Sequence, residues 1–250
     1  MPQLSNKIAI VTGAGSGFGE GIARAYVAEG AKVVLTDINA AAVERVAGEL
    51  GESGVAYTCD VADKAQVQAL VDHCVATWGV PDIVVNNAGI AQDNQPVTAT
   101  DEATYDRLFA VNVKSVYNMT VAVVPLMKAR RSGVILNIGS TAGIRPRPGL
   151  TWYNATKAAV NNISKTMAVE LGPDNIRVNA ICPVIGETGL TSQFMGMPDT
   201  PENRAKFVAT IPLGRFSTPR DIATAAVFLA SDAADFLTGM EFTVDGGRTV

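Results

Sequence analysis

Histidine and cysteine are scarce in this chain of 250 residues, which contains one histidine, His73, and three cysteines. The cysteines, Cys59, Cys74 and Cys182, lie far apart and form no CxxC pair. A structural zinc site needs four clustered cysteine or histidine ligands, so the sequence argues against zinc and predicts no metal site. Sparse, odd-numbered thiols also fit a reducing compartment better than a disulfide framework, which predicts a cytoplasmic protein.

Dense runs of basic or apolar residues are absent as well. The formal net charge is −4, and the lysine and arginine clusters are too small to predict binding to nucleic acid or to an anionic membrane. No stretch approaches the roughly 18 consecutive apolar residues of a membrane-spanning helix. The N-terminal segment lacks a charged region followed by a long apolar one, so no signal peptide is expected.

Apolar residues, by contrast, make up 48% of the chain and fall into a regular alternation of short and long segments. Short runs rich in β-branched residues predict strands at 7–13, 32–37, 55–60, 82–89, 133–140, 176–183 and 241–247. Helix-length segments separate them, at 18–29, 39–50, 63–78, 101–130, 152–171 and 219–231. Two of these helices have start signals, Asp63 with Gln66 and Thr218 before Pro219.

This alternation predicts an α/β fold in which residues 1–250 form a single domain. We expect a Rossmann-type, doubly wound parallel sheet of about seven strands with helices on both faces. One segment, 184–213, interrupts the alternation with glycines, prolines and an apolar cluster around Phe194. A long insertion at the carboxyl end of a strand is typical of a binding loop, so this segment is predicted to be a substrate-binding lid.

A glycine-rich turn, "TGAGSGFG" at 12–19, directly follows the first predicted strand and opens the first helix. Glycines at 13, 17 and 19 would let the backbone approach a pyrophosphate, and the helix N-terminus offers free N–H groups. Asp37 ends the second strand, where an acid binds the ribose hydroxyls of NAD and repels the 2′-phosphate of NADP. Each feature alone also occurs without a ligand, but their combination predicts NAD as cofactor.

Tyr153 and Lys157, in "YNATK", lie four positions apart and therefore share one face of a helix. Such a pair is often only a surface contact. A nearby ammonium, however, lowers the pKa of a phenol and makes it a usable general base. Ser140 ends the fifth strand, at the edge of the sheet where ligands bind, and its hydroxyl would hold a substrate oxygen opposite Tyr153.

The order of these motifs resembles the short-chain dehydrogenase/reductase family along essentially the full chain. The similar stretches are "TGAGSGFG" (12–19), "CDV" (59–61), "NNAG" (86–89), "VNV" around Asn112, "GS" ending at Ser140, "YNATK" (153–157) and "IRVNAICP" (176–183). The resemblance implies that Tyr153 is the acid/base, that Lys157 binds the nicotinamide ribose, that Ser140 orients the substrate oxygen, and that Asn112 supports a proton path to Lys157.

The same resemblance implies the remaining contacts. Cofactor contacts are expected from Gly13, Ser16, Gly17, Phe18, Gly19, Asp37, Ile38, Asp60, Val61, Asn87, Ala88, Gly89, Tyr153, Lys157, Pro183, Ile185 and Thr188. Substrate contacts are expected from Ser140, Tyr153, Val184, Gly186 and Phe194. Val184 departs from the family, which usually has glycine there, and puts a β-branched side chain near the nicotinamide.

The resemblance therefore implies an NAD(H)-dependent enzyme that interconverts a secondary alcohol and a ketone, and a homotetramer. An NADPH-dependent 3-oxoacyl carrier-protein reductase and a non-catalytic NAD-binding module remain as alternatives. The substrate stays open between a carbohydrate, a hydroxy acid and a cyclic or aromatic alcohol. "QDNQ" (92–95) suits a polyol, whereas Arg145, Arg147 and Arg204 would suit an anion but are expected to face water.

Overall fold

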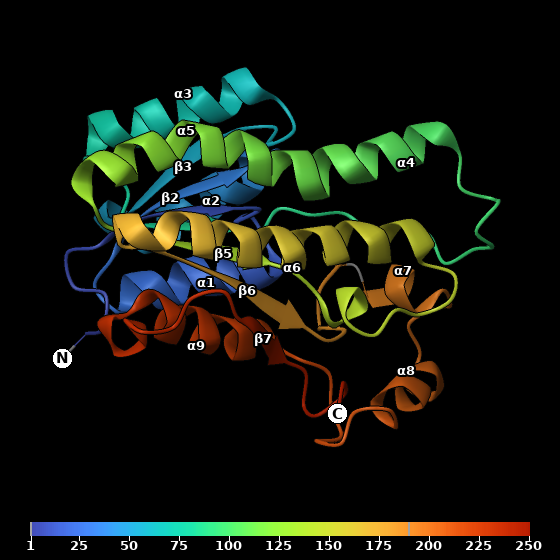
Figure 1. The fold of residues 1–250 in the computed structure, drawn as a ribbon. Helices are drawn as coiled ribbons and strands as arrows, with labels where there is room; N and C mark the ends of the chain where they lie inside the picture. Colours follow the sequence, from blue (N-terminus) through green and yellow to red (C-terminus); the bar gives the residue numbers. More distant parts are fainter. Residues whose placement is uncertain (1, 190) are drawn as a thin grey trace.

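The computed structural model describes residues 2–189 and 191–250, and within them seven strands form one parallel sheet. The strand order is β3-β2-β1-β4-β5-β6-β7. All seven predicted strands are confirmed: β1 Ile8–Thr12, β2 Lys32–Asp37, β3 Gly54–Thr58, β4 Ile83–Asn86, β5 Gly133–Ile138, β6 Ile176–Pro183 and β7 Glu241–Val244. The Rossmann-type sheet with helices on both faces is therefore the observed fold (Figure 1).

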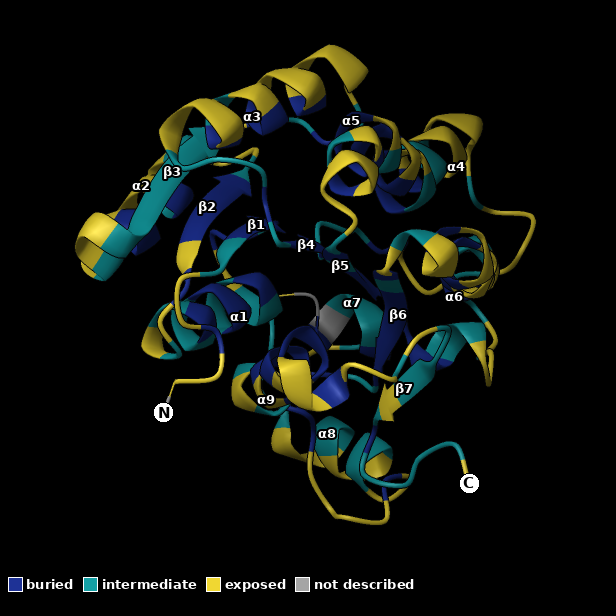
Figure 2. Cartoon of the chain, turned by 60° about the vertical axis from the view of Figure 1, so that its left-hand side comes forward, coloured by how far each residue is buried: buried dark blue, intermediate teal, exposed yellow. Residues whose placement is uncertain are grey.

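The two helical layers explain why the strands are apolar at consecutive positions. In β1, Ala9 and Val11 face one hydrophobic cluster, and Ile10 faces the other. The first cluster contains buried residues of α1 Gly17–Ala28, α2 Ala40–Leu50 and α9 Pro219–Ala230. The second contains residues of α3 Lys64–Thr77, α5 Ser115–Arg130 and α6 Thr151–Leu171, on the opposite side of the sheet (Figure 2).

The strand order reverses at β1, which pairs with β2 on one side and with β4 on the other. The chain therefore leaves β1 and β4 toward opposite faces of the sheet, which opens a crevice beyond their carboxyl ends. Ligands of open α/β sheets bind at such a switch point. The glycine turn after β1 and the "NNAG" stretch after β4 meet at this crevice.

The helix predicted at 101–130 contains one turn of π-helix. It begins as α4 Glu102–Phe109, passes through the π-helical turn Ala110–Lys114 and continues as α5. By length and composition alone, the stretch Glu102–Arg130 is apolar enough to cross a membrane, with a mean hydropathy of 1.2, but half of that window is buried in the fold. A core helix of a soluble protein passes the same test, so the lack of a membrane partner stays a prediction.

The 184–213 segment contains two short helices that the sequence pattern does not predict, α7 Thr191–Met195 and α8 Pro201–Val208. Both lie beyond the carboxyl end of β6, on the side of the molecule where the crevice opens (Figure 1). An apolar cluster of Met195, Ile211 and Phe216 holds the segment together, and Val184 packs against it. The segment therefore has a small core of its own beside the sheet.

The two helix start signals have different outcomes. The Asp63 carboxylate accepts hydrogen bonds from the N–H groups of Ala65 and Gln66, but the Gln66 side chain accepts from the Asp60 N–H instead of closing a reciprocal pair. At α9 the reciprocal capping box is complete, because the Thr218 hydroxyl accepts from the Asp221 N–H and the Asp221 carboxylate accepts from the Thr218 N–H.

We therefore expect Thr218→Ala to lower the free energy of unfolding by about 1 kcal/mol, because the N–H of residue 221 loses its side-chain acceptor. Thr224→Ala is the matched control on the same helix, where the hydroxyl is exposed and bonds only to the Arg220 carbonyl. Urea denaturation measures both variants. Equal destabilisation of the two would show that the cap contributes nothing specific.

Candidate active site

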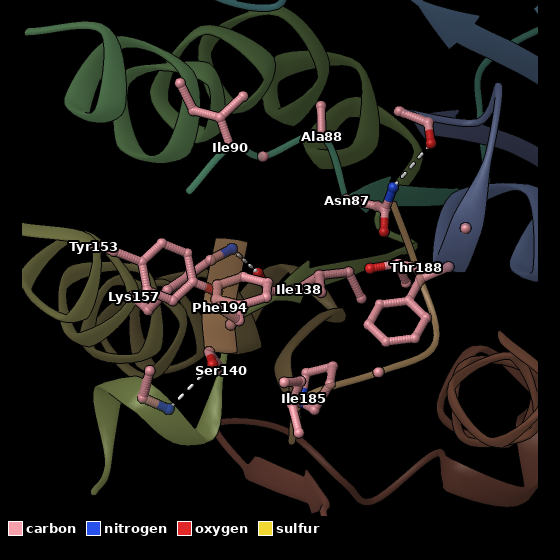
Figure 3. A pocket seen from close by; sticks show the side chains of 18 of the residues that line it. Asn87, Ala88, Ile90, Ile138, Ser140, Tyr153, Lys157, Ile185, Thr188 and Phe194 are labelled. Carbon is pink, nitrogen blue, oxygen red and sulfur yellow. Dashed lines mark hydrogen bonds between the residues drawn. The ribbon is translucent and has the colours of Figure 1, made fainter. Parts of the chain in front are cut away.

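A cavity of about 500 Å³ lies at the carboxyl edge of the sheet. It extends from the glycine turn after β1 to the loop that follows β5, and the 184–213 segment borders it. In Figure 3, Tyr153, Lys157, Ser140 and Phe194 lie on one side of this cavity, and Asn87 and Thr188 lie on the other. The cavity therefore joins the predicted dinucleotide site to the predicted reacting groups.

The glycine turn presents an open helix N-terminus to the cavity. Ser16 is the N-cap of α1, but its side chain makes no capping hydrogen bond, which leaves backbone N–H groups available to an anion. Gly17 has φ +57°, a left-handed conformation that favours glycine. Gly19 packs so closely on the Gly13 carbonyl that any side chain there would collide with it. This arrangement fits the pyrophosphate of a dinucleotide.

Asn87 joins the turn after β1 to the end of β4. Its side-chain amide donates to the Thr12 carbonyl at 2.8 Å and to the Gly13 carbonyl at 3.1 Å. In return, the N–H groups of Asn87 and Ala88 both donate to the Thr12 hydroxyl at 3.0 Å. The Asn87 amide is therefore engaged in shaping the turn, while Asn87, Ala88 and Gly89, all predicted cofactor contacts, line the cavity.

Asp37 lies at the end of β2 with its carboxylate held in place. Oδ2 accepts from the Gly15 N–H and Oδ1 accepts from the Asn39 N–H, each at 3.0 Å. Each carboxylate oxygen keeps capacity for another donor, which suits a pair of ribose hydroxyls. Ile38 beside it is 60% exposed and lines the cavity, as a side chain that covers an adenine would be.

Asp60 and Val61 also line the cavity, beyond the end of β3. The Asp60 carboxylate is already paired, because Oδ2 contacts the Arg107 guanidinium at 3.2 Å and Oδ1 accepts from the Ala62 N–H at 3.0 Å. Its predicted contact with the cofactor would therefore compete with an existing ion pair. Among the described residues, no group of three or more His, Cys, Asp or Glu side chains is placed to hold a metal ion.

Tyr153 and Lys157 are buried on one face of α6 and point into the cavity beside the end of β5 (Figure 3). The Lys157 Nζ donates to the Ile138 carbonyl at 2.8 Å and lies 5.9 Å from the centre of the Tyr153 ring. Ser140 follows β5, where its hydroxyl accepts from the Ala142 N–H at 3.0 Å and lines the same cavity as the Tyr153 phenol. The three predicted reacting groups are thus brought together.

Burial sets the proton affinities of this cluster. It raises the pKa of Tyr153 to about 12, whereas the hydrogen bond with Ser140 and the positive charge of Arg147 act to lower that pKa. Burial also lowers the pKa of Lys157 to about 8. The sequence predicted that Lys157 lowers the phenol pKa, whereas in the structure the interactions that lower it come from Ser140 and Arg147. A bound cation beside the phenol would lower the same pKa further.

Asn112 lies behind the cluster, in the π-helical turn, and does not line the cavity. Its side-chain amide exchanges two hydrogen bonds of 2.9 Å with the backbone of Ile90 and donates to the Thr156 hydroxyl at 3.0 Å. A π-helical turn often marks a functional position. These hydrogen bonds use the polar atoms of the Asn112 side chain to hold the loop after β4 against α6. The role of Asn112 in a proton path stays a prediction.

The substrate side of the cavity has apolar walls. Leu150, Ala91, Ala142 and Phe194 pack around Tyr153, and the rings of Phe194 and Tyr153 meet edge to face with centroids 5.1 Å apart. Of the predicted "QDNQ" polyol contacts, Gln92 is buried and accepts from the Tyr153 N–H at 2.9 Å. It therefore positions the start of α6 instead of offering its amide to a sugar.

Cavity lining separates the predicted contacts into two groups. Every predicted cofactor and substrate residue lines the cavity except Gly19, which lies beneath the turn; of the predicted catalytic residues, Asn112 does not line it. The sequence did not predict the cavity contacts of Ile90, Arg107, Leu150, Phe207, Arg248 and Thr249. It predicted that Arg145 and Arg147 face water; Arg145 is indeed exposed and Arg147 is half-buried, and both line the cavity. A signal for the arginines was present, because "RPRP" (145–148) lies between Ser140 and Tyr153 and its prolines restrict the loop.

Several known proteins are similar to this chain over nearly its full length. Residues 13–249 match the family described as enoyl-(acyl carrier protein) reductase. The chain is 47% identical to a 4-formylbenzenesulfonate dehydrogenase of Comamonas testosteroni, over 99% of this chain and 100% of that one. It is 40% identical to a galactitol 2-dehydrogenase of Agrobacterium fabrum, over 98% of each. A 3-ketoacyl-(acyl-carrier-protein) reductase from Brucella melitensis, solved with NADH, is similar with 45% identity, a TM-score of 0.94 and coverage of 99% and 100%.

The effect of Ser140 on the pKa of Tyr153 leads to a prediction about pH. Ser140→Ala removes an interaction that lowers the pKa of Tyr153, so an activity that needs the phenolate must rise at higher pH than in the wild type. We expect turnover in alcohol oxidation to fall about 100-fold as well, because a donor to the reacting oxygen is lost.

Initial rates of NAD reduction between pH 6 and about 10.5, a range that brackets the ordinary phenol pKa, measure both effects. Ser140→Thr keeps the hydroxyl and serves as the control, with a profile close to that of the wild type. A Ser140→Ala profile that rises at the wild-type pH would contradict the assignment.

Proposed function

Because the chain belongs to the short-chain dehydrogenase/reductase family, we propose that it interconverts a secondary alcohol and a ketone, with NAD(H) as the hydride carrier. One observation carries the proposal: the phenol of Tyr153, the hydroxyl of Ser140 and the ammonium of Lys157 face the cavity that also contains the glycine turn and Asp37. A nicotinamide and a substrate bound there would meet beside the phenol.

Three residues of the chain have different roles in the proposed reaction. In the oxidation direction the Tyr153 phenolate accepts the hydroxyl proton of the alcohol. The Ser140 hydroxyl donates to the substrate oxygen and stabilises the charge that develops there. Lys157, fixed by the Ile138 carbonyl, holds the ribose side of the cofactor and keeps a positive charge near the phenolate. When bound, the dinucleotide supplies the hydride acceptor.

The preference for NAD over NADP rests on Asp37. Its carboxylate is anchored by two backbone N–H groups, so it cannot swing away from a 2′-phosphate without losing both hydrogen bonds. The following residue is Ile38, so no arginine stands beside it to neutralise a phosphate. The NADH in the Brucella melitensis reductase structure supports the same choice by analogy.

A second candidate function is reduction of a 3-oxoacyl group carried by acyl carrier protein. The similarity to the 3-ketoacyl-(acyl-carrier-protein) reductase from Brucella melitensis favours this activity, because the two chains are 45% identical over 99% of this chain. Reduction of acetoacetyl-CoA, compared with that of small ketones, separates the two activities. A non-catalytic NAD-binding module is the third, and it predicts NADH binding with no turnover of either kind of substrate.

The assembly and location remain proposals as well. We propose a homotetramer, supported by large apolar side chains that α4, α5 and α6 expose: Tyr105, Tyr117, Val121 and Val169. Light scattering of the purified protein tests it. We propose that the protein works in the cytoplasm, where its three buried thiols would stay reduced.

Tyr153→Phe tests the proposed reaction. Removing only the phenol oxygen keeps the ring against Phe194, and we expect turnover to fall by about 10²- to 10⁴-fold, the usual contribution of a general acid or base. NADH binding, followed by fluorescence titration, should stay within about twofold because the ring remains in place. Tyr57→Phe, on the edge strand β3 and outside the cavity, is the matched control. Full activity in Tyr153→Phe would refute the assignment.

Asp37→Asn tests the cofactor preference. The amide keeps the size of the side chain and removes the charge that repels a 2′-phosphate, although its NH2 group can no longer accept one of the two backbone hydrogen bonds. We expect the ratio of kcat/KM with NADH to that with NADPH to fall by about 100-fold, since a like-charge contact costs several kcal/mol. Asp72→Asn, exposed on α3, is the control for loss of one negative charge. An unchanged ratio in Asp37→Asn would place the discrimination elsewhere.

A further inference from the structure

Arg147 lies in the loop between Ser140 and Tyr153, and its side chain lines the substrate side of the cavity. One Nη2–H donates to the Phe194 carbonyl at 2.9 Å, and the guanidinium lies 5.3 Å from the centre of the Phe207 ring. The Asn154 amide, next to the reacting tyrosine, donates to the Arg147 carbonyl at 2.8 Å and fixes its backbone. This half-buried cation is therefore held in a defined place, and most of its five N–H donors have no acceptor within the described part of the chain.

The charges that line the cavity are unevenly distributed. Its lining carboxylates, among the described residues, are Asp37 and Asp60, which follow β2 and β3 on the adenosine side. Arg145, Arg147 and Arg248 line the other side, and no carboxylate within the described ranges pairs with any of them. Arg145 instead donates to the Arg248 carbonyl at 2.9 Å, which ties the C-terminal segment to this loop.

Three guanidinium groups that lie near one another without a carboxylate partner repel each other, which disfavours their charged forms. Burial, together with the charge of Arg248, lowers the pKa of Arg147, which is the direction expected when a guanidinium lacks an acidic partner. An anion bound between these arginines would remove that penalty and form charge-assisted hydrogen bonds with the free N–H groups. Arg204 does not belong to the group, because it pairs with Asp199 and does not line this cavity.

The walls between the arginines and the reacting groups define the rest of the ligand. Leu150 and Phe194 present apolar surface next to Tyr153, and Ser140 lies at the reacting end. A molecule that satisfies both regions has an apolar body, a carbonyl or alcohol at one end and a negative charge at the other.

We propose that Arg147, with Arg145 and Arg248 beside it, binds an oxyanion group of the substrate, a carboxylate or a sulfonate, while the apolar body lies against Phe194 and Leu150. The proposal rests on the proposed function, because it places the reacting carbon at Tyr153. It replaces the expectation that Arg145 and Arg147 serve only as solvated side chains.

The test compares three ketones that differ in charge: 4-acetylbenzoate, 4-acetylbenzenesulfonate and the neutral methyl 4-acetylbenzoate. NADH oxidation gives kcat and KM for each, and calorimetry gives the affinity of each for the protein saturated with NADH. We expect kcat/KM to favour at least one of the anions over the ester by about 10- to 100-fold, the range for a hydrogen bond to a charged group. The two anions distinguish a carboxylate from a sulfonate site.

Arg147→Gln should reduce this preference to within about threefold, mainly through KM, while Arg147→Lys should retain part of it as a point charge. Loss of the Arg147 charge also raises the pKa of Tyr153, which slows all three ketones alike and leaves the ratio unaffected. Arg248→Gln, which leaves the Phe194 contact intact, provides a second variant if Arg147→Gln fails to fold. Arg220→Gln, exposed on α9, is the matched control.

Each outcome decides the proposal. Equal kcat/KM and equal affinity for the anions and the ester in the wild type would overturn it, and so would failure of all three to bind. An equal loss with all three ketones in Arg147→Gln would also overturn it, and would leave Arg147 as a purely structural link to α7. Binding of an anion that depends on Arg147, without any turnover, would support the anion site while the proposed reaction fails.

Discussion

The rest of the site depends on the burial of two ionisable side chains, Tyr153 and Lys157, against the end of β5. Taking a phenol and an ammonium out of water raises the first pKa and lowers the second, so neither group has its solution chemistry. The hydrogen bond from Lys157 to the Ile138 carbonyl replaces part of the lost hydration and fixes α6 to the sheet. Small changes in nearby charge then control whether Tyr153 is a base or an acid.

The frame that holds these groups is itself polar. Asn86 donates to Asn137 at 2.8 Å, and Asn137 donates to the Ser164 hydroxyl at 2.9 Å, which links β4, β5 and α6 through buried side chains. Asn87 and Thr12 link β4 to β1 in the same way. The cofactor half and the reacting half of the cavity are therefore fixed relative to each other by hydrogen bonds as well as by packing.

The sequence predicted the sheet well because parallel strands buried on both faces are almost wholly apolar, as Ile83 to Val85 illustrate. It predicted the residues around the glycine turn and Tyr153 through local spacing on a single turn or helix. It did not predict α7 and α8, because both helices are short and the glycines and prolines that flank them obscure a helical pattern. It also could not assign Gln92 or Arg147, since the partners of both side chains depend on long-range folding.

The central claim is that the site converts a phenol of high pKa into a base when the cofactor binds. Labelling the tyrosines with ¹³C at Cζ, and assigning Tyr153 by substitution, allows its titration to be followed directly by NMR. We expect Tyr153 to ionise at lower pH when NAD is bound than in the protein alone, where burial keeps its pKa high, because the added positive charge favours phenolate. A Tyr153 resonance that titrates at the same pH with and without NAD would contradict the account.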